Sequence, residues 1–252
     1  MKKYIIITCR LNSQRLPLKA LRKINDKEFI VHIFDRLKSL KLKKFHIILS
    51  TTKNKEDDLL VDLAIENQID FFRGEDVDVF KRIVDTMRKF SIDNAILTTG
   101  DNIFIDIDAI IKLHKFHLNN ENDFSYTHGL SWGTFTYAIN FKAASKLCKI
   151  KNVNDTELWH DYFKKINMFK SSMLIFNKDT KGLSLRLTTD ESKDLELIKI
   201  IFKKLEINYN NIPTDTIISF LLSNKKLILI NNNIQIKKQS KLILKDRYKK
   251  LL

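Results

Sequence analysis

Glycine and proline are scarce in this sequence, with five and two among 252 residues, and long apolar runs are missing altogether. The low glycine and proline content, with the apolar content, indicates a regularly structured chain and argues against disorder of its bulk. Apolar residues make up 44% of the chain, which is enough for a substantial core. We therefore expect a compact α/β protein of one large domain or two small ones.

No apolar run approaches the roughly 20 residues that cross a bilayer. The N-terminal apolar run, residues 4–9, is also too short for a secretory signal. We therefore expect a cytoplasmic protein with no membrane partner. The two cysteines, Cys9 and Cys148, lack metal-ligand spacing and predict buried free thiols rather than a disulfide framework or a zinc site.

Positive charge is concentrated at the carboxyl end of the chain. The formal net charge is +15, and residues 225–252 contain nine Lys or Arg against Asp246 alone. Such a tail suits nucleic acid, a membrane surface or no partner. The abundance of Lys, Asn and Ile throughout offers biased coding composition as a simpler explanation. No compact nucleic-acid-binding motif is present, so nucleic acid is the less favoured partner.

Short apolar runs alternate with amphipathic stretches over the first half of the chain. The β-branched, continuously apolar runs predict strands buried on both faces. Strands that alternate with helices of 10 to 15 residues predict right-handed crossovers and a doubly wound, mostly parallel sheet, whose ligands bind at the carboxyl ends of the strands. The predicted strands are residues 4–9, 45–49, 69–72 and 95–98, and the predicted helices are 29–37, 55–67 and 77–90.

The pattern loosens after about residue 123. We expect a single domain in which residues 1–122 form one half, residues 123–185 extend the sheet and add a small lobe, and residues 186–252 complete the chain. The predicted strands of this part are residues 124–127, 134–140, 171–176 and 184–187, and the predicted helices are 142–147, 156–166, 192–205 and 214–222.

The loop after the first predicted strand carries three cations and short polar side chains. Arg10 and Arg15 can each hold phosphate oxygens in a fork, and Lys19 supplies a compact point charge. Asn12 and Ser13 suit a turn whose backbone N–H groups face a phosphate. The loop is therefore a candidate triphosphate site, with an ordinary solvated loop as the alternative.

Four sequence blocks resemble one known family. Residues 10–19 read Arg-Leu-Asn-Ser-Gln-Arg-Leu-Pro-Leu-Lys, and residues 72–82 read Phe-Arg-Gly-Glu-Asp-Val-Asp-Val-Phe-Lys-Arg. Residues 99–106 read Thr-Gly-Asp-Asn-Ile-Phe-Ile-Asp, and residues 186–196 read Arg-Leu-Thr-Thr-Asp-Glu-Ser-Lys-Asp-Leu-Glu. In this order they resemble the CTP-dependent cytidylyltransferases, which include the SpsF-type spore-coat polysaccharide proteins and the CMP-sialic acid and CMP-Kdo synthetases.

The resemblance implies a Rossmann-like fold of the nucleotide-diphospho-sugar transferase type and transfer of CMP from CTP, with Mg²⁺ as cofactor. It implies catalytic roles for Arg10, Arg15, Lys19 and Asp101, with Asp101 and Asp190 as metal ligands. Carboxylates from two distant segments can share Mg²⁺ with phosphate oxygens and water. The residues implied in nucleotide binding are Arg10, Leu11, Asn12, Ser13, Arg15, Lys19, Arg73, Gly74, Arg82, Thr99 and Gly100.

Simpler structural roles stay open for several of these residues. Asp190 can be a helix N-cap and Asp101 a turn residue. Arg82 can pair with Asp78 or Asp85 across a helical turn. The family also usually has glycine where this chain has Asn12 and Leu18, and another pair where it has Asn102 and Ile103.

We expect the middle lobe to bind the acceptor through Tyr137, Glu157 and His160, although Glu157 can also be an ordinary charge on a helix surface. The favoured acceptor is small and anionic, a 2-keto-3-deoxy acidic sugar of the sialic or Kdo type. Transfer to a phosphorylated alcohol or sugar, which gives a CDP-linked product, is the near alternative. A basic nucleic-acid-binding protein and a non-catalytic member of the family are the more distant ones. The resemblance also implies a homodimer.

Overall fold

A computed structural model describes residues 2–13, 15–177, 184–235 and 243–251 of the protein. Part of the predicted basic tail, residues 236–242, lies outside the described residues. Within the described ranges, no helix is both long and apolar enough to cross a membrane.

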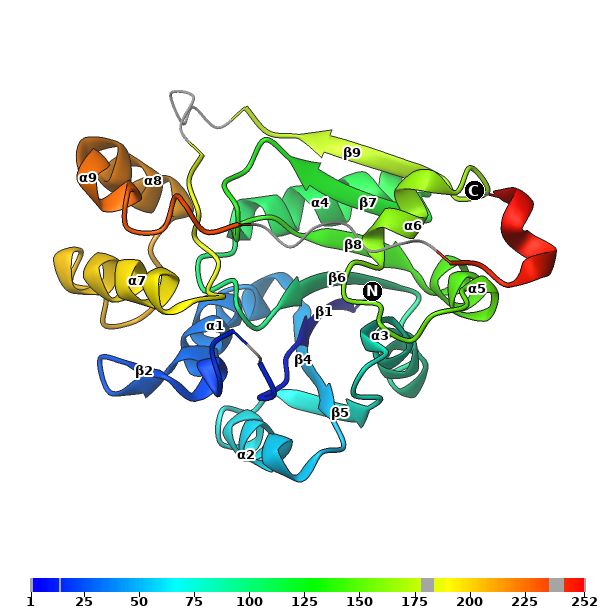
Figure 1. The fold of residues 1–252 in the computed structure, drawn as a ribbon, viewed down its shortest axis with the longest axis horizontal. Helices are drawn as coiled ribbons and strands as arrows, with labels where there is room; N and C mark the ends of the chain where they lie inside the picture. The colour runs from blue at the N-terminus through cyan, green and yellow to red at the C-terminus, as the bar shows by residue number, and fades with distance from the viewer. Residues whose placement is uncertain (1, 14, 178–183, 236–242, 252) are drawn as a thin grey trace.

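A seven-stranded sheet runs through the molecule, with helices on both of its faces (Figure 1). Four strands of the first half lie side by side and pair in parallel, as predicted. The prediction of a doubly wound, mostly parallel sheet is confirmed. In spatial order these four strands are β5 (Asp70–Gly74), β4 (Phe45–Thr52), β1 (Lys3–Thr8) and β6 (Asn94–Thr99).

The sheet continues into the second half with β8 (Tyr137–Asn140), β7 (Phe124–His128) and β9 (Ser171–Ile175). Strand β8 runs antiparallel to both β6 and β7, and β9 pairs in parallel with β7. The link from β7 to β8 is too short for a crossover helix, so these two strands form an antiparallel pair. The predicted strand at residues 184–187 is wrong, because this segment makes only an isolated bridge through Arg186.

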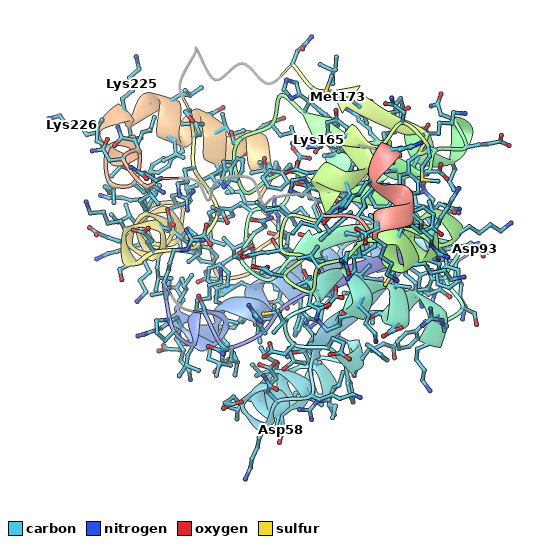
Figure 2. The ribbon with its side chains drawn as sticks, turned by 45° about the vertical axis from the view of Figure 1, so that its right-hand side comes forward. Asp58, Asp93, Lys165, Met173, Lys225 and Lys226 are labelled. Carbon is cyan, nitrogen blue, oxygen red and sulfur yellow. The ribbon has the colours of Figure 1, made fainter. Side chains whose placement is uncertain are left out.

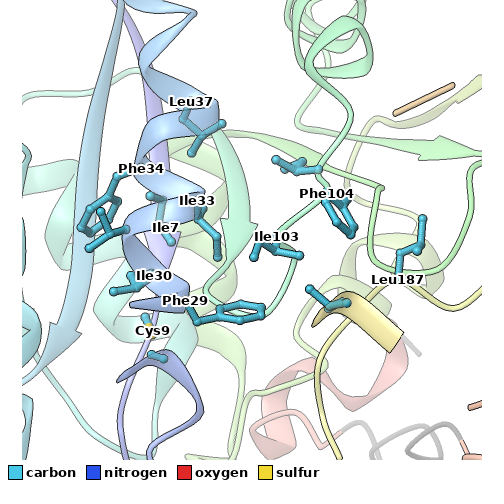
Figure 3. Packing of buried hydrophobic residues seen from close by; sticks show 14 of the residues in the cluster. Ile7, Cys9, Phe29, Ile30, Ile33, Phe34, Leu37, Ile103, Phe104 and Leu187 are labelled. Atoms are coloured by element: carbon cyan, nitrogen blue, oxygen red, sulfur yellow. The ribbon is translucent and has the colours of Figure 1, made fainter. Parts of the chain in front are cut away.

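Consecutive residues of β1 point into two separate cores. Ile5 and Ile7 are fully buried in one cluster and Ile6 in the other, since successive side chains of a strand face opposite sides of the sheet. Both faces are covered, which explains the continuous apolar run in the sequence. Figure 3 shows the first core, where Ile30 and Ile33 pack near Ile7.

Different helices cover the two faces of the sheet. The second core is covered by α3 (Val79–Lys89), α5 (Phe141–Ile150) and α6 (His160–Lys165). The helices on the first core are α1 (Phe29–Lys38), α2 (Asp58–Glu66), α4 (Ile107–Asn119), α7 (Ser192–Lys204), α8 (Thr214–Ser223) and α9 (Lys225–Ile228).

Three helices differ from the prediction, and one of them is the short helix α9, which was not predicted. Helix α4 was not predicted, although its buried Ile110 and Leu113 recur with helical spacing. Helix α6 begins at His160 rather than near residue 156. Its predicted first turn is lost because the Thr156 hydroxyl donates a hydrogen bond to the Asp78 carboxylate and accepts one from a backbone N–H of α3.

Candidate active site

A cleft of about 830 Å³ opens at the carboxyl ends of β1 and β6. The loop after β1 and residues 99–101 at the end of β6 form its floor. Its walls come from residues 76–82, 155–159 and 190–191. Segments far apart in the sequence therefore meet where a doubly wound sheet binds its ligands. The predicted site residues that line the cleft are Arg10, Asn12, Ser13, Arg15, Lys19, Arg82, Thr99, Gly100, Asp101, Glu157 and Asp190.

Lys19 joins the two predicted metal ligands. Its Nζ donates hydrogen bonds to Asp101 Oδ2 at 2.8 Å, to the Thr189 carbonyl at 2.8 Å and to Asp190 Oδ1 at 3.3 Å. Burial alone would lower the pKa of Lys19, but the carboxylates of Asp101 and Asp190 outweigh it and raise that pKa. The ammonium therefore stays charged at neutral pH.

Asp101 sits at the end of β6 and is held as a carboxylate. Burial would raise its pKa, but the charge of Lys19 and the hydrogen bonds from Lys19 and Thr99 outweigh it and lower the pKa. The Asp101 carbonyl also accepts the Thr189 N–H at 3.0 Å, which ties this turn to the segment before α7. The two carboxylates of the site are thus connected through backbone as well as through Lys19.

Asp190 is fixed by two arginines that approach it from different sides. Arg15 Nη2 lies 3.0 Å from Asp190 Oδ1, and Arg186 Nη2 lies 2.9 Å from Oδ2. Arg186 also binds the fully buried Asp194 through two hydrogen bonds of 2.8 and 3.0 Å. Asp194 in turn accepts the N–H groups of Asp190 and Glu191. Arg186 and Asp194 therefore position Asp190, a role the sequence analysis did not assign although both residues lie in the fourth block.

Arg10 has an acidic partner that the sequence analysis missed. Its Nη1 lies 2.7 Å from Asp76 Oδ1, and Asn54 Nδ2 donates to Asp76 Oδ2 at 2.9 Å. Burial would raise the pKa of Asp76, but the hydrogen bonds from Asn54 and Arg10 outweigh it and lower the pKa. This pair brings Arg10 to the wall formed by residues 76–82.

Arg82 is a cation buried in the wall of the cleft. Its side chain is only 1% exposed, and its Nη1 donates to the carbonyls of Glu75 and Asp76. Nε has no partner among the described residues, and no carboxylate there forms an ion pair with the guanidinium. Burial lowers its pKa to about 10. A buried charge without a counter-ion is costly, so an anion in the cleft would stabilise this residue.

The floor of the cleft requires glycine after Thr99. A Cβ at Gly100 would lie 2.5 Å from Cys9 Sγ and 2.7 Å from Cys9 Cβ. The Gly100 N–H also donates to the Thr8 carbonyl at 2.9 Å, which continues the pairing of β1 and β6. Burial raises the pKa of Cys9 to about 12, so this thiol stays protonated and serves as packing.

Leu18 adopts left-handed backbone immediately before Lys19, with φ of 54° and ψ of 27°. This conformation costs a residue with a Cβ about 1–2 kcal/mol relative to right-handed backbone. Leu18 is one of the two positions at which the family that the four sequence blocks resemble usually has glycine. Asn12, the other such position, does not have positive φ and lines the cleft.

Leu11, Arg73 and Gly74 lie outside the cleft lining. Leu11 is buried in the first core, and its N–H donates to Asp57 Oδ1 at 2.8 Å. Arg73 donates to the carbonyls of Thr52 and Asn54 and pairs with Asp58 at 2.6 Å. Gly74 packs under Arg82, where a Cβ would lie 3.0 Å from Arg82 Cγ. The structure gives these three residues supporting contacts with the loops rather than places in the cleft wall.

Tyr137 and His160 also lie outside the lining. Their rings stack with centroids 5.0 Å apart, and both contact Trp159, which does line the cleft. Burial, together with the charge of Lys164, lowers the pKa of His160 to about 4, so the imidazole is neutral at pH 7. These two residues therefore back the wall that Glu157 and Trp159 form.

A buried ion pair anchors that wall to α3. Lys151 Nζ pairs with Asp78 Oδ2, and Thr156 Oγ1 donates to Asp78 Oδ1 at 2.8 Å. Asp78 also caps α3 by accepting the Lys81 N–H. The predicted pairing of Arg82 with Asp78 is replaced by this arrangement. Residues 155–159 thus keep a fixed position relative to Arg82.

Asp101 and Asp190 are the two carboxylates that the resemblance implies as metal ligands. No cluster of three or more His, Cys, Asp or Glu in the described part of the chain could hold a metal alone. Two carboxylates that reach the same Lys19 ammonium are nevertheless close enough to share one cation. Mg²⁺ is commonly bound by one or two carboxylates together with substrate phosphates, so the donor set fits a cation that arrives with a phosphorylated ligand.

The sheet order and the cluster of cations and carboxylates at its carboxyl edge define a nucleotidyltransferase. The family model for cytidylyltransferases matches residues 4–213, and the chain belongs to this family. The resemblance in the four sequence blocks is confirmed.

Two curated relatives align along most of the chain. An uncharacterized protein of Methanocaldococcus jannaschii, MJ1063, is 32% identical over 93% of this chain and 96% of its own length. The spore coat polysaccharide biosynthesis protein SpsF of Bacillus subtilis is 24% identical over 79% of this chain and 85% of its own length.

Solved structures share the fold. A cytidylyltransferase from Leptospira borgpetersenii superposes with a TM-score of 0.81 at 22% identity, covering 94% of this chain and all of that one. A CMP:2-keto-3-deoxy-manno-octonic acid synthetase complexed with CTP gives a TM-score of 0.63 at 15% identity, covering 81% of this chain and all of that one.

Proposed function

We propose that the protein transfers CMP from CTP to a small anionic acceptor, with a 2-keto-3-deoxy acidic sugar as the favoured one, and releases pyrophosphate. The observation that carries this proposal is the meeting of Lys19, Asp101 and Asp190 in one cleft with Arg10 and Arg82. Membership of the cytidylyltransferase family supports CTP as the nucleotide.

Arg10, Lys19 and Arg82 would bind the triphosphate. Arg82 has no carboxylate partner in the described structure, and Arg10 pairs with Asp76 at a partly exposed position where a phosphate can compete. A guanidinium binds phosphate oxygens as a fork, while an ammonium can follow charge that develops on the α-phosphate. Catalysis by these residues consists of positioning and electrostatic stabilisation.

Asp101 and Asp190 would hold a divalent cation, for which Mg²⁺ is the proposed identity. Such a cation would neutralise triphosphate charge and orient the α-phosphate. The arginine and aspartate behind Asp190 keep its carboxylate in place while Lys19 changes partner. The CTP complex of a protein with the same fold is consistent with a triphosphate in this cleft.

The reaction is an in-line displacement. An acceptor hydroxyl oxygen bonds to the α-phosphorus of CTP, and the bond from that phosphorus to the bridging oxygen breaks, so that pyrophosphate leaves with the electron pair. The hydroxyl proton passes to a carboxylate at the side of the cleft formed by residues 155–159 and 190–191.

The acceptor is proposed from two observations. The printed names of SpsF and of the CMP:2-keto-3-deoxy-manno-octonic acid synthetase point to polysaccharide precursors and to a keto-deoxy sugar acid. Arg15, whose side chain is 40% exposed, lines the cleft and can hold an acceptor carboxylate while Asp155 and Glu191 accept hydrogen bonds from sugar hydroxyls.

Nucleotide binding is tested first by thermal unfolding with each of the four nucleoside triphosphates in the presence of Mg²⁺. A ligand at 100 times its Kd stabilises by about 2.7 kcal/mol, or roughly 5–10 °C for a chain of this size. We expect the largest increase in Tm with CTP. An equal response to all four nucleotides, or none, would contradict the assignment of CTP.

Turnover is tested by pyrophosphate release from CTP with a panel of sugar acids and phosphate monoesters. We expect release with a sugar acid and a loss of at least roughly 100-fold in Asp101→Asn, the scale of losing one transition-state charge contact. Asp108→Asn, an exposed position on α4, is the matched control and should keep full activity. If only a phosphate monoester supports pyrophosphate release, the proposed sugar acid is wrong and the acceptor is a phosphate monoester. If no acceptor in the panel supports release, the enzyme proposal is overturned.

A further inference from the structure

The ammonium of Lys19 is bound as a small cation would be. Three oxygens surround it, from Asp101, Asp190 and the Thr189 carbonyl, at 2.8 to 3.3 Å. The side chain is only 13% exposed, so the ammonium has exchanged most of its water for these oxygens. Carboxylate and carbonyl oxygens are also the preferred ligands of hard divalent cations.

A divalent cation and this ammonium cannot occupy the same place. Mg²⁺ requires oxygens at about 2.0–2.1 Å. Asp101 Oδ2 and Asp190 Oδ1, which both contact Lys19 Nζ, are oxygens that would hold such a cation. Like charges a few ångströms apart repel strongly where water is partly excluded. Lys19 must therefore leave the two carboxylates before a metal can bridge them.

Resting on the proposed function, we infer that the Lys19 ammonium holds the metal position in the nucleotide-free protein, and that only a cation arriving with a triphosphate displaces it efficiently. A metal alone would leave the ammonium partly buried beside a dication and without a partner. A triphosphate supplies phosphate oxygens as new partners for Lys19, whose flexible four-carbon stem allows the ammonium to move.

The other cations of the site do not share this arrangement. Of the two carboxylates Asp101 and Asp190, Arg15 and Arg186 pair with Asp190 and not with Asp101 in the described structure. Arg10 pairs with Asp76 on another wall of the cleft. Of the cations in the described part of the chain, Lys19 is the one with ion pairs to both Asp101 and Asp190. It therefore couples the binding of metal to the binding of nucleotide, and this coupling must be reciprocal.

The test is Mn²⁺ binding to the full-length protein without nucleotide, measured by electron paramagnetic resonance of free Mn²⁺. We expect Lys19→Met to bind Mn²⁺ at least tenfold more tightly than the parent, because the two carboxylates are then free of the ammonium. Lys23→Met removes an exposed lysine four residues away and should leave Mn²⁺ affinity unchanged. Thermal unfolding verifies that each variant is folded. If Lys19→Met is not folded, Lys19→Gln is used in its place.

The same titration repeated with CTP measures the coupling. In the parent, CTP should raise Mn²⁺ affinity by at least tenfold more than it does in Lys19→Met. Equal or weaker Mn²⁺ binding by the nucleotide-free Lys19 variants would overturn the inference, and absence of Mn²⁺ binding to every protein would overturn the metal position itself. Failure of the proposed function would be seen in a different experiment, the turnover assay, in which no acceptor would support pyrophosphate release from CTP.

Discussion

Replacement of Arg186 by methionine tests how Asp190 is held. Arg186 is buried, and its guanidinium joins the fully buried Asp194 to Asp190 through three hydrogen bonds. Methionine keeps much of the side-chain volume but removes the charge. The change leaves the Asp194 carboxylate buried without its counter-ion and removes one of the groups that orient Asp190.

The expected loss of stability follows from the contacts that remain. Removing one partner of a buried ion pair costs about 3–5 kcal/mol. Asp194 keeps three N–H donors, from the backbone of Asp190 and Glu191 and from Asn231 Nδ2. The loss should therefore lie near the lower end, at about 3 kcal/mol. The affinity for CTP with Mn²⁺ should also fall in Arg186→Met.

The assay is urea unfolding followed by the fluorescence of Trp132 and Trp159, with the free energy obtained by linear extrapolation. Arg88→Met is the matched control, because Arg88 is 60% exposed and pairs with Asp85 on the surface of α3. Such a pair contributes at most about 0.5 kcal/mol. A loss below 1 kcal/mol in Arg186→Met, or an equal loss in both variants, would show that Arg186 does not stabilise the buried Asp194 carboxylate.

Two further predictions concern the packing beneath the cleft and the response to acid. Gly100→Ala should lose about 1–3 kcal/mol of unfolding free energy, because the added Cβ overpacks against Cys9. Cys9→Gly in the same chain should restore part of that loss. An unchanged unfolding free energy in Gly100→Ala would contradict the close approach of Gly100 to Cys9. Burial, with the charge of His114, lowers the pKa of His117 from 6.5 to about 4. The unfolded chain therefore takes up a proton at a higher pH than the folded protein does. The free energy of unfolding should fall as the pH falls from about 6.5 to 4, by up to about 3 kcal/mol from this group. Urea unfolding across this range should show a flatter pH profile for His117→Gln, and identical profiles would exclude His117 as the cause.

The fold of the first half, residues 1–122, was predictable because its physical signals are local. The continuous apolar run of β1 follows from burial on both faces, and cations after a strand mark the edge where ligands bind. Helix α4 was missed although its spacing was readable, and β8 could not be oriented because strand direction depends on the length and path of the β7–β8 connection. The cytoplasmic location and the homodimer stay predictions, and the basic tail keeps the alternatives that its composition offers. Figure 2 shows Lys225 and Lys226, where this tail begins, projecting from the outer end of α9.

The partners of the site residues were less predictable than the residues themselves. Arg10, Lys19 and Asp101 could be selected from their blocks, but their pairing depends on contacts between segments far apart in sequence. Asp76 was visible only as part of the second block, and nothing local indicated that it pairs with Arg10. Arg73 was selected by the same block, yet its guanidinium binds carbonyls that the fold of the β4 loop places beside it.

Anomalous diffraction of Mn²⁺ in crystals grown with a non-hydrolysable CTP analogue would locate the metal relative to Asp101, Asp190 and Lys19. We expect one Mn²⁺ peak beside Asp101 and Asp190, with Lys19 Nζ moved onto triphosphate oxygens in the same cleft. A peak elsewhere, or a triphosphate bound while Lys19 still bridges the two carboxylates, would contradict this expectation.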